Sequence, residues 1–290
     1  MSSEKQGEPG TVAVDVGGKA AKGTYKAELG EKPPRLRMND VGITYIDPQG
    51  HKTEAVKEIT LDIVDKPGVG EIVVFLGPSG CGKSTILKAV AGILPPTRGE
   101  ILMNGEPVTH VGRDRGMVFQ AYTSFAWMTV KDNVEYGLRL RGVTKHEREE
   151  QSAKYLKAVG LAEFGDRYPK DLSGGMKQRV AIARTLINKP QLVLMDEPFG
   201  ALDPQTRWGM QSLLLDVSRT EDNTILFVTH DVSEAVYLAD SIYVLASRPT
   251  HILHRVDVPF FENRDIALKS STEFRNVEKK LLDLLYSTSS

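Results

Sequence analysis

The sequence has little cysteine, no long apolar run and almost no net charge, and each absence excludes a class of protein. The single cysteine among 290 residues, Cys81, rules out an intramolecular disulfide and a CxxC metal site. No apolar stretch reaches the roughly 20 residues that cross a bilayer, and the polar N-terminus lacks a signal-peptide core. A formal net charge of −1 creates no overall field for nucleic acid. We therefore expect a cytosolic chain without a nucleic-acid partner.

The chain is predicted to begin with a disordered tail. Residues 1–35 are rich in Gly, Lys, Glu and Ser and show no apolar periodicity. From residue 36 onward short β-prone runs appear. The runs at 36–45 and 55–63 are predicted to pair as antiparallel strands. The run at 72–76 is continuously apolar, which is typical of a buried parallel strand.

Helices and strands then alternate, which predicts an α/β fold. Thr144 and Glu147 form a capping-box pattern that opens a helix of about fifteen residues. Together with further helical spacing, it predicts a mainly helical insertion at about 121–189. Further strands are expected at 192–195, 224–228 and 242–245, and helices at 83–91, 176–187 and 204–218. A short appendage at 251–290 is predicted to hold two β-prone pieces and a helix near 272–285.

The first chemical motif directly follows the apolar run at 72–76. Residues 77–84 read G-P-S-G-C-G-K-S and match GxxxxGK[ST] at every fixed position. Glycines let backbone N–H groups approach phosphate oxygens, and the following helix points its positive end at them. Lys83 is expected to reach the β- and γ-phosphates and Ser84 to bind Mg²⁺. The predicted nucleotide-binding loop consists of Gly77, Pro78, Ser79, Gly80, Cys81, Gly82, Lys83, Ser84 and Thr85.

The second motif is an apolar strand that ends in two carboxylates. Leu192–Met195 is followed by Asp196 and Glu197. Asp196 is predicted to hold Mg²⁺ through water, and Glu197 is placed to act as the general base on the attacking water. Solvated acids are common at strand ends, so the pair gains its meaning from the nucleotide loop upstream.

The third motif is a second glycine-led helix start. Residues 172–179 read L-S-G-G-M-K-Q-R, with Ser173 placed as the helix cap and a phosphate donor. This string, lying between the other two motifs, is the signature of ATP-binding-cassette (ABC) ATPases. The chain resembles that family over residues 36–250. The resemblance implies a P-loop ABC ATPase with a RecA-like core, an antiparallel β subdomain and a helical insertion.

The resemblance also implies roles for four isolated residues. Gln120 resembles the Q-loop glutamine, which contacts Mg²⁺ and the lytic water, and His230 resembles the switch histidine at the γ-phosphate. Asp203 lies in an A-L-D string that resembles the D-loop. Tyr45 resembles the aromatic residue that stacks on adenine, although a strand-end tyrosine can also be a packing residue.

Two cassettes pair head to tail in this family, so the resemblance implies that the signature residues complete the ATP site of a second subunit. The implied catalytic residues are Glu197, His230, Lys83 and Gln120. The implied Mg²⁺ ligands are Ser84, Gln120 and Asp196. The implied ATP contacts outside the nucleotide loop are Tyr45, Gln120, Ser173, Gly174, Gly175 and Asp203.

A single cassette without a membrane span resembles the separate ATPase subunit of a bacterial importer. The implied partners are a second cassette (identical or paralogous), integral membrane permease subunits and, indirectly, a periplasmic or lipoprotein substrate-binding protein. The implied location is peripheral, on the cytoplasmic face of the inner membrane. The alternative is a non-transport ABC ATPase of translation or DNA repair. Such proteins carry two cassettes or long coiled coils, and this chain shows neither.

Narrower cues concern the cargo. Cys81 and the segments Phe125–Val130 and Ala246–Pro249 resemble the importer group for nitrate, sulfonate, taurine and bicarbonate. The resemblance implies a small anion as cargo. Phe125 and Trp127 are candidates for lining the groove that receives the coupling helix of the permease; Trp127 could instead pack inside the helical insertion.

Overall fold

The computed structural model describes residues 24–25, 33–64, 68, 70–260 and 264–286. Most of the predicted tail at 1–35 lies outside the described residues. Within it, Thr24–Tyr25 forms a short strand, β1, that pairs parallel with β3. Within the described ranges, no helix combines the length and apolar character needed to cross a membrane.

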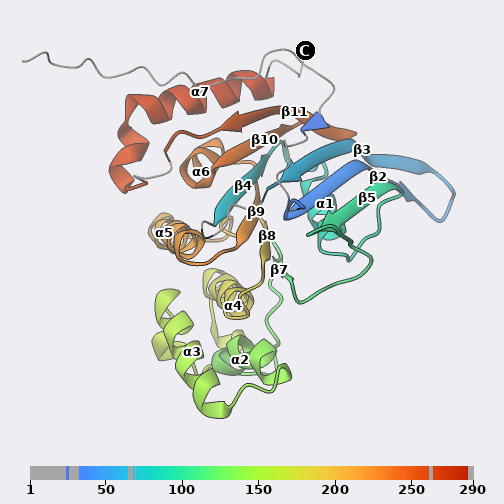
Figure 1. The fold of residues 1–290 in the computed structure, drawn as a ribbon. Helices are drawn as coiled ribbons and strands as arrows, with labels where there is room; N and C mark the ends of the chain where they lie inside the picture. Colours follow the sequence, from blue (N-terminus) through green and yellow to red (C-terminus); the bar gives the residue numbers. More distant parts are fainter. Residues whose placement is uncertain (1–23, 26–32, 65–67, 69, 261–263, 287–290) are drawn as a thin grey trace, which may run out of the picture.

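Among the described residues, ten further strands build one sheet with β1, in the order β6-β5-β2-β3-β11-β10-β4-β9-β8-β7 (Figure 1). The antiparallel pair predicted at the start of the chain is confirmed as β2 and β3. The strand bounds are Leu36–Ile46 (β2), Lys52–Ile63 (β3), Glu71–Leu76 (β4), Arg98–Met103 (β5), Glu106–Pro107 (β6), Arg115–Val118 (β7), Leu192–Asp196 (β8), Thr224–Thr229 (β9), Ser241–Leu245 (β10) and Thr250–Asp257 (β11).

The parallel half of the sheet positions the chemistry. Strands β10, β4, β9, β8 and β7 run parallel to one another, whereas β10 pairs antiparallel with β11 on its other side. Every residue of β4, β8 and β9 is buried, which explains the continuous apolar run within each strand. Because the strands are parallel, their carboxyl ends meet at one edge of the sheet, where α/β proteins bind ligands. The nucleotide loop, the two carboxylates, Gln120 and His230 all follow these ends.

The helices fall into separate groups (Figure 1). The helices α2, α3 and α4 form the predicted helical insertion at one end of the molecule, and α7 lies at the other. The predicted capping box is present: the Thr144 hydroxyl accepts from the Glu147 backbone, and the Glu147 side chain accepts from the Thr144 backbone. The helix bounds are Lys83–Val90 (α1), Val130–Leu140 (α2), Lys145–Ala158 (α3), Gly174–Leu186 (α4), Pro204–Thr220 (α5), Val232–Leu238 (α6) and Thr272–Tyr286 (α7), with 3₁₀ turns at Ala162–Phe164, Pro169–Asp171 and Ile266–Ser270.

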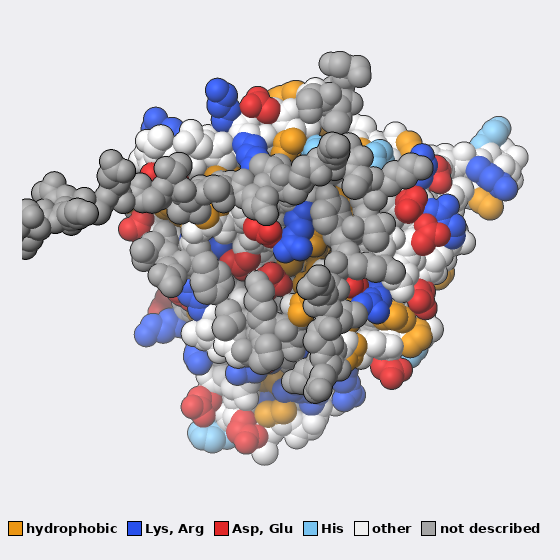
Figure 2. All heavy atoms as spheres, turned by 45° about the horizontal axis from the view of Figure 1, so that its top comes forward, with side chains coloured by type: hydrophobic (Ala, Val, Ile, Leu, Met, Phe, Trp, Pro, Cys, Tyr) orange, Lys and Arg blue, Asp and Glu red, His pale blue; other side chains and the backbone are white. Residues whose placement is uncertain are grey.

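The chain after residue 249 first adds a strand to the main sheet and then leaves the sheet. Instead of two short β-prone pieces, the described residues there form one strand, β11, between β10 and β3. The chain then continues to α7, whose Phe274, Val277 and Leu281 are buried in the main core. In the view of Figure 2, positive and negative side chains are interspersed on the part of the surface that is not drawn in grey.

Candidate functional site

The loop between β4 and α1 adopts a conformation that only glycine supports easily. Gly80 and Gly82 have φ angles of 76° and 124°, in the left-handed region. A Cβ on Gly82 would lie 2.7 Å from the Thr250 hydroxyl oxygen. The Thr250 hydroxyl donates to the Cys81 carbonyl, so the start of β11 braces the loop. The glycines are therefore needed both for backbone geometry and for space.

Lys83 is held under this loop. Its side chain is 4% exposed, and its ammonium donates to the carbonyls of Gly77 at 2.8 Å and Pro78 at 2.9 Å. The same nitrogen lies 3.7 Å from a carboxylate oxygen of Glu197. A buried ammonium at the first turn of a helix is suited to bind an anion.

The Glu197 carboxylate is the meeting point of three predicted catalytic side chains. Its Oε1 lies 3.2 Å from His230 Nδ1 and 3.7 Å from Lys83 Nζ. Its Oε2 accepts from Gln120 Nε2 at 3.4 Å. Glu197 also has φ = 44°, a conformation that a non-glycine residue adopts at a cost and that is concentrated at functional sites. Three strand ends thus hold one carboxylate in a defined position.

Asp196 and Ser84 form a contact that fits a magnesium site. The Ser84 hydroxyl donates to Asp196 Oδ1 at 2.8 Å. Burial raises the pKa of Asp196, because the carboxylate has lost water without gaining a full counter-charge. In the described part of the chain no three His, Cys, Asp or Glu side chains gather as a metal cluster. One carboxylate and one hydroxyl nevertheless suit Mg²⁺, which commonly takes its other ligands from water and substrate phosphates.

Lys83, Ser84, Gln120 and Glu197 line a cavity of about 260 Å³, whereas Asp196 and His230 are not among its lining residues. Its lining residues are Ser79, Gly80, Gly82, Lys83, Ser84, Thr85, Gln120, Glu197 and Arg248. All but Arg248 were predicted as site residues. Arg248 lies in the segment Ala246–Pro249, which resembles the importer group for small anions and was not predicted to bind nucleotide. The Cys81 side chain is 2% exposed and belongs to the core instead, where burial raises its pKa.

The second glycine-led helix start lies elsewhere. Ser173, Gly174, Gly175 and Asp203 are all absent from the lining of this cavity. The Ser173 hydroxyl caps α4 by accepting from the Met176 backbone, and the Asp203 carboxylate caps α5 by accepting from Thr206. A Cβ on Gly175 would lie 3.1 Å from a side-chain methyl of Leu202, so the two motifs adjoin each other. One chain therefore carries two separate glycine-led helix starts.

Comparisons with known proteins agree with this arrangement. A family profile described as ABC transporter matches residues 60–200. A nitrate import ATP-binding protein of Synechocystis is 45% identical, with 86% of this chain and 94% of the relative covered. A taurine import ATP-binding protein of Roseobacter denitrificans is 39% identical over 87% of this chain and 94% of the relative. This chain is an ABC transporter ATP-binding protein.

Solved structures of ABC cassettes support the same fold. A dimeric cassette in a post-hydrolysis state, bound to ADP and Pi, matches with a TM-score of 0.66 and 31% identity, over 75% of this chain and 98% of that one. Proteins of this family are ATPases, so ATP is the nucleotide that this chain binds and hydrolyses. The predicted fold class, with its parallel core, antiparallel strands and helical insertion, is confirmed.

Tyr45 lies at the rim of the cassette's nucleotide loop. Its hydroxyl is 3.2 Å from the Thr85 hydroxyl at the first turn of α1. The residue is 42% exposed, so the ring is available to a planar ligand. Its place beside the loop supports adenine stacking, which stays a prediction.

Proposed function

We propose that this chain is the ATP-hydrolysing subunit of an importer for a small anion such as nitrate, sulfonate, taurine or bicarbonate. It works with a second cassette and integral membrane permease subunits, and indirectly with a periplasmic or lipoprotein substrate-binding protein. On this proposal it lies peripherally on the cytoplasmic face of the membrane. Relatives named for nitrate and taurine import favour this function over a role in translation or DNA repair. The convergence of Lys83, His230 and Gln120 on Glu197 carries the hydrolytic part.

The proposed hydrolysis assigns each group one task. Glu197 accepts a proton from water as the water oxygen bonds to the γ-phosphorus, and the bond from that phosphorus to the bridging oxygen breaks. Lys83 and His230 stabilise the charge that develops on the γ-phosphate oxygens. Mg²⁺, held by Ser84, Asp196 and Gln120, would supply further charge neutralisation when bound.

The separation of the two motif groups supports a shared site. Ser173 and Gly175 lie at the N-terminus of α4, outside the phosphate cavity of their own chain. Such a helix start binds anions well. We therefore infer that it closes over the ATP held by a second cassette, with Asp203 alongside it, and that closure rather than ATP binding alone permits hydrolysis.

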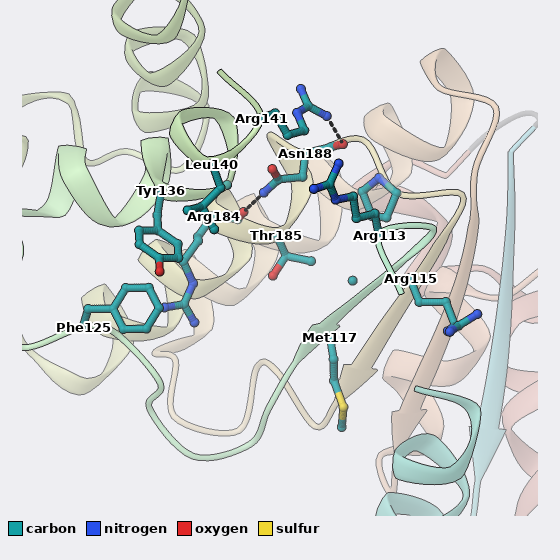
Figure 3. Close-up of a pocket in the computed structure, with 13 residues that line it drawn as sticks. Arg113, Arg115, Met117, Phe125, Tyr136, Leu140, Arg141, Arg184, Thr185 and Asn188 are labelled. Carbon is teal, nitrogen blue, oxygen red and sulfur yellow. Dashed lines mark hydrogen bonds between the residues drawn. The ribbon is translucent and has the colours of Figure 1, made fainter. Parts of the chain in front are cut away.

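The helical insertion carries a groove suited to a permease helix. A cavity of about 330 Å³ lies between α2, α4 and β7, lined by Phe125, Tyr136, Leu140 and several arginines. Figure 3 shows the Arg184 side chain beside the rings of Phe125 and Tyr136, with Leu140 and Arg141 farther along the groove. The Arg184 guanidinium lies 4.8 Å from the centre of the Phe125 ring. Trp127, 73% exposed, extends the aromatic surface from Phe125 at 5.5 Å between ring centres.

Leu140→Glu is expected to break permease binding. Leu140 is 65% exposed at the groove, and a carboxylate buried there against an apolar helix would lose its water. Affinity purification of the tagged chain from membranes should recover a polytopic membrane protein. The Leu140→Glu variant should bind that membrane protein roughly tenfold more weakly and recover less of it.

The matched control is Ile93→Glu, because Ile93 is also an exposed aliphatic residue, at 47%, but lies outside the groove. It should recover the membrane protein as the unaltered chain does. Unchanged ATP binding by both variants would show that they fold. Recovery of ribosomes or DNA-repair complexes without any membrane subunit would contradict the importer function.

A further inference from the structure

The C-terminal segment, residues 264–286, is fastened to the helix that follows His230. Arg264 is 9% exposed, and its guanidinium donates to the carbonyls of Leu238 and Ala239 at the end of α6, at 2.5 and 2.8 Å. It also pairs with Asp240 at 2.5 Å, and Asp240 in turn accepts from the Ile72 backbone at the start of β4. A cation at the negative end of a helix is favourable. The segment is thus anchored to the end of α6 and to the start of β4.

Lys269 reaches from this segment to residues of α5 and α6. Its ammonium lies 4.4 Å from the centre of the Tyr237 ring and 5.6 Å from that of Trp208. It donates to Gln211 Oε1 at 3.2 Å. Burial lowers the pKa of Lys269, and nearby Asp231 and Glu234 act in the opposite direction. The two aromatic rings and the Gln211 oxygen therefore favour a positively charged side chain that donates a hydrogen bond.

The contacts continue from Gln211 to the peptide that carries His230. Gln211 is 2% exposed and donates from Nε2 to Glu234 Oε1 at 3.2 Å. The Glu234 carboxylate also accepts from the Thr229 hydroxyl. The Thr229 oxygen accepts from the Asp231 backbone at 3.0 Å. Thr229 and Asp231 are the two neighbours of His230, so the chain of contacts ends on both sides of that residue.

We propose that Lys269 is a positioning residue for His230, acting through Gln211, Glu234 and Thr229. This inference rests on the role proposed above for His230. Without Lys269, the buried Gln211 Oε1 loses its donor, and a partly satisfied buried network is free to rearrange. The C-terminal segment then becomes part of the hydrolytic machinery without touching nucleotide.

Lys269→Met tests this proposal, because methionine keeps the apolar stem and removes the charge and the donor. We expect kcat for ATP hydrolysis to fall roughly fivefold, the effect of one lost hydrogen bond. The KM for ATP and the equilibrium binding of ATP should stay unchanged. Lys269→Arg should restore most of kcat. Lys279→Met, on the exposed face of α7, should behave as the unaltered protein.

Combination with His230→Ala separates the two proposals. If His230 acts as proposed, His230→Ala alone loses most hydrolysis, and adding Lys269→Met changes nothing further. If His230→Ala retains hydrolysis, the role of His230 is wrong. If it loses hydrolysis while Lys269→Met keeps the normal kcat, only the present inference is overturned. Should Lys269→Met not fold, Gln211→Leu interrupts the same contacts from α5 and must lower kcat in the same way.

A separate observation concerns Arg248. It lines the phosphate cavity with Ser79 and Gly80, is exposed, and forms no hydrogen bond or ion pair within the described residues. Two residues later, Thr250 holds the loop at Cys81. A second cation at the rim of a phosphate site, beside Lys83, would compensate the charge of a triphosphate. Arginine is suited to hold two phosphate oxygens at once.

We infer that Arg248 binds the terminal phosphate of ATP in its own subunit, a deepening of the proposed site. Arg248→Ala should weaken ATP binding roughly tenfold and ADP binding much less, since one charge-assisted hydrogen bond is lost only with ATP. Arg248→Lys should restore part of the difference. Arg275→Ala, an exposed arginine on α7, is the control.

Equilibrium titration of the full chain with ATP and with ADP gives the two dissociation constants. If their ratio in Arg248→Ala equals that of the unaltered protein, the inference is overturned. Lys83→Ala tests the site itself, because it should weaken both nucleotides. If Lys83→Ala binds both normally, the nucleotide site is misassigned whatever Arg248 does.

Discussion

Glu197→Gln is expected to bind ATP normally and to lose hydrolysis by about 10²–10⁴-fold, the usual contribution of a general base. Glutamine has the same shape and keeps hydrogen-bonding capacity toward His230 and Gln120, which both contact the carboxylate. It cannot accept a proton from water. With hydrolysis blocked, ATP remains in both sites, and the closed pair of cassettes should accumulate.

Two measurements check this expectation. Single-turnover phosphate release gives the chemical step, and size-exclusion chromatography with ATP and Mg²⁺ gives the fraction of dimer, which should fall when ADP replaces ATP. Glu163→Gln is the matched control, because Glu163 is an exposed glutamate in the helical insertion. Turnover at the normal rate in Glu197→Gln would mean that another group accepts the proton.

The fold was predictable where burial leaves a pattern in the sequence. The strands β4, β8 and β9 are buried on both faces, so each is a continuous apolar run bounded by polar residues. The predicted bounds differ from the observed ones by one residue at most. Parallel pairing then places everything that follows these strands at one edge. Motifs more than 100 residues apart in sequence, such as those of Ser84 and Asp196, therefore come together at this edge.

Other features depend on contacts that no local pattern encodes. The backbone of β11 pairs with β10 on one side and with β3 on the other. This pairing places Arg248, just before β11, at the phosphate cavity. Lys269 meets Gln211 across 58 residues. The φ angle of Glu197 likewise follows from its surroundings rather than from its residue type. Such features follow from tertiary packing, which sequence periodicity does not report.

The two glycine-led helix starts lie apart in one chain, and a substitution at either of them is expected to have a large effect on ATP hydrolysis. Lys83→Ala and Ser173→Asp should each abolish hydrolysis, for different reasons. The first removes the buried ammonium from the phosphate cavity. The second keeps a good helix cap on α4, since aspartate caps as well as serine, but it sets a negative charge against the partner's γ-phosphate. Both proteins should stay folded and be inactive as pure dimers.

Mixing the two inactive proteins should restore activity. In a head-to-tail pair, one site combines the two altered parts, and the other combines the intact nucleotide loop of the Ser173→Asp chain with the intact helix start of the Lys83→Ala chain. Random pairing makes half of the dimers mixed, each with one intact site, so roughly a quarter of normal hydrolysis is expected.

The control mixture combines Lys83→Ala with Glu197→Gln. Both substitutions lie around the same cavity of one chain, so in a mixed dimer each site keeps one defect, and no activity should return. Restoration in the first mixture together with silence in the second requires that each site draws on two chains. If Ser173→Asp alone hydrolyses ATP normally, or if the first mixture stays inactive, the nucleotide site is complete within one subunit and α4 serves only the helical insertion.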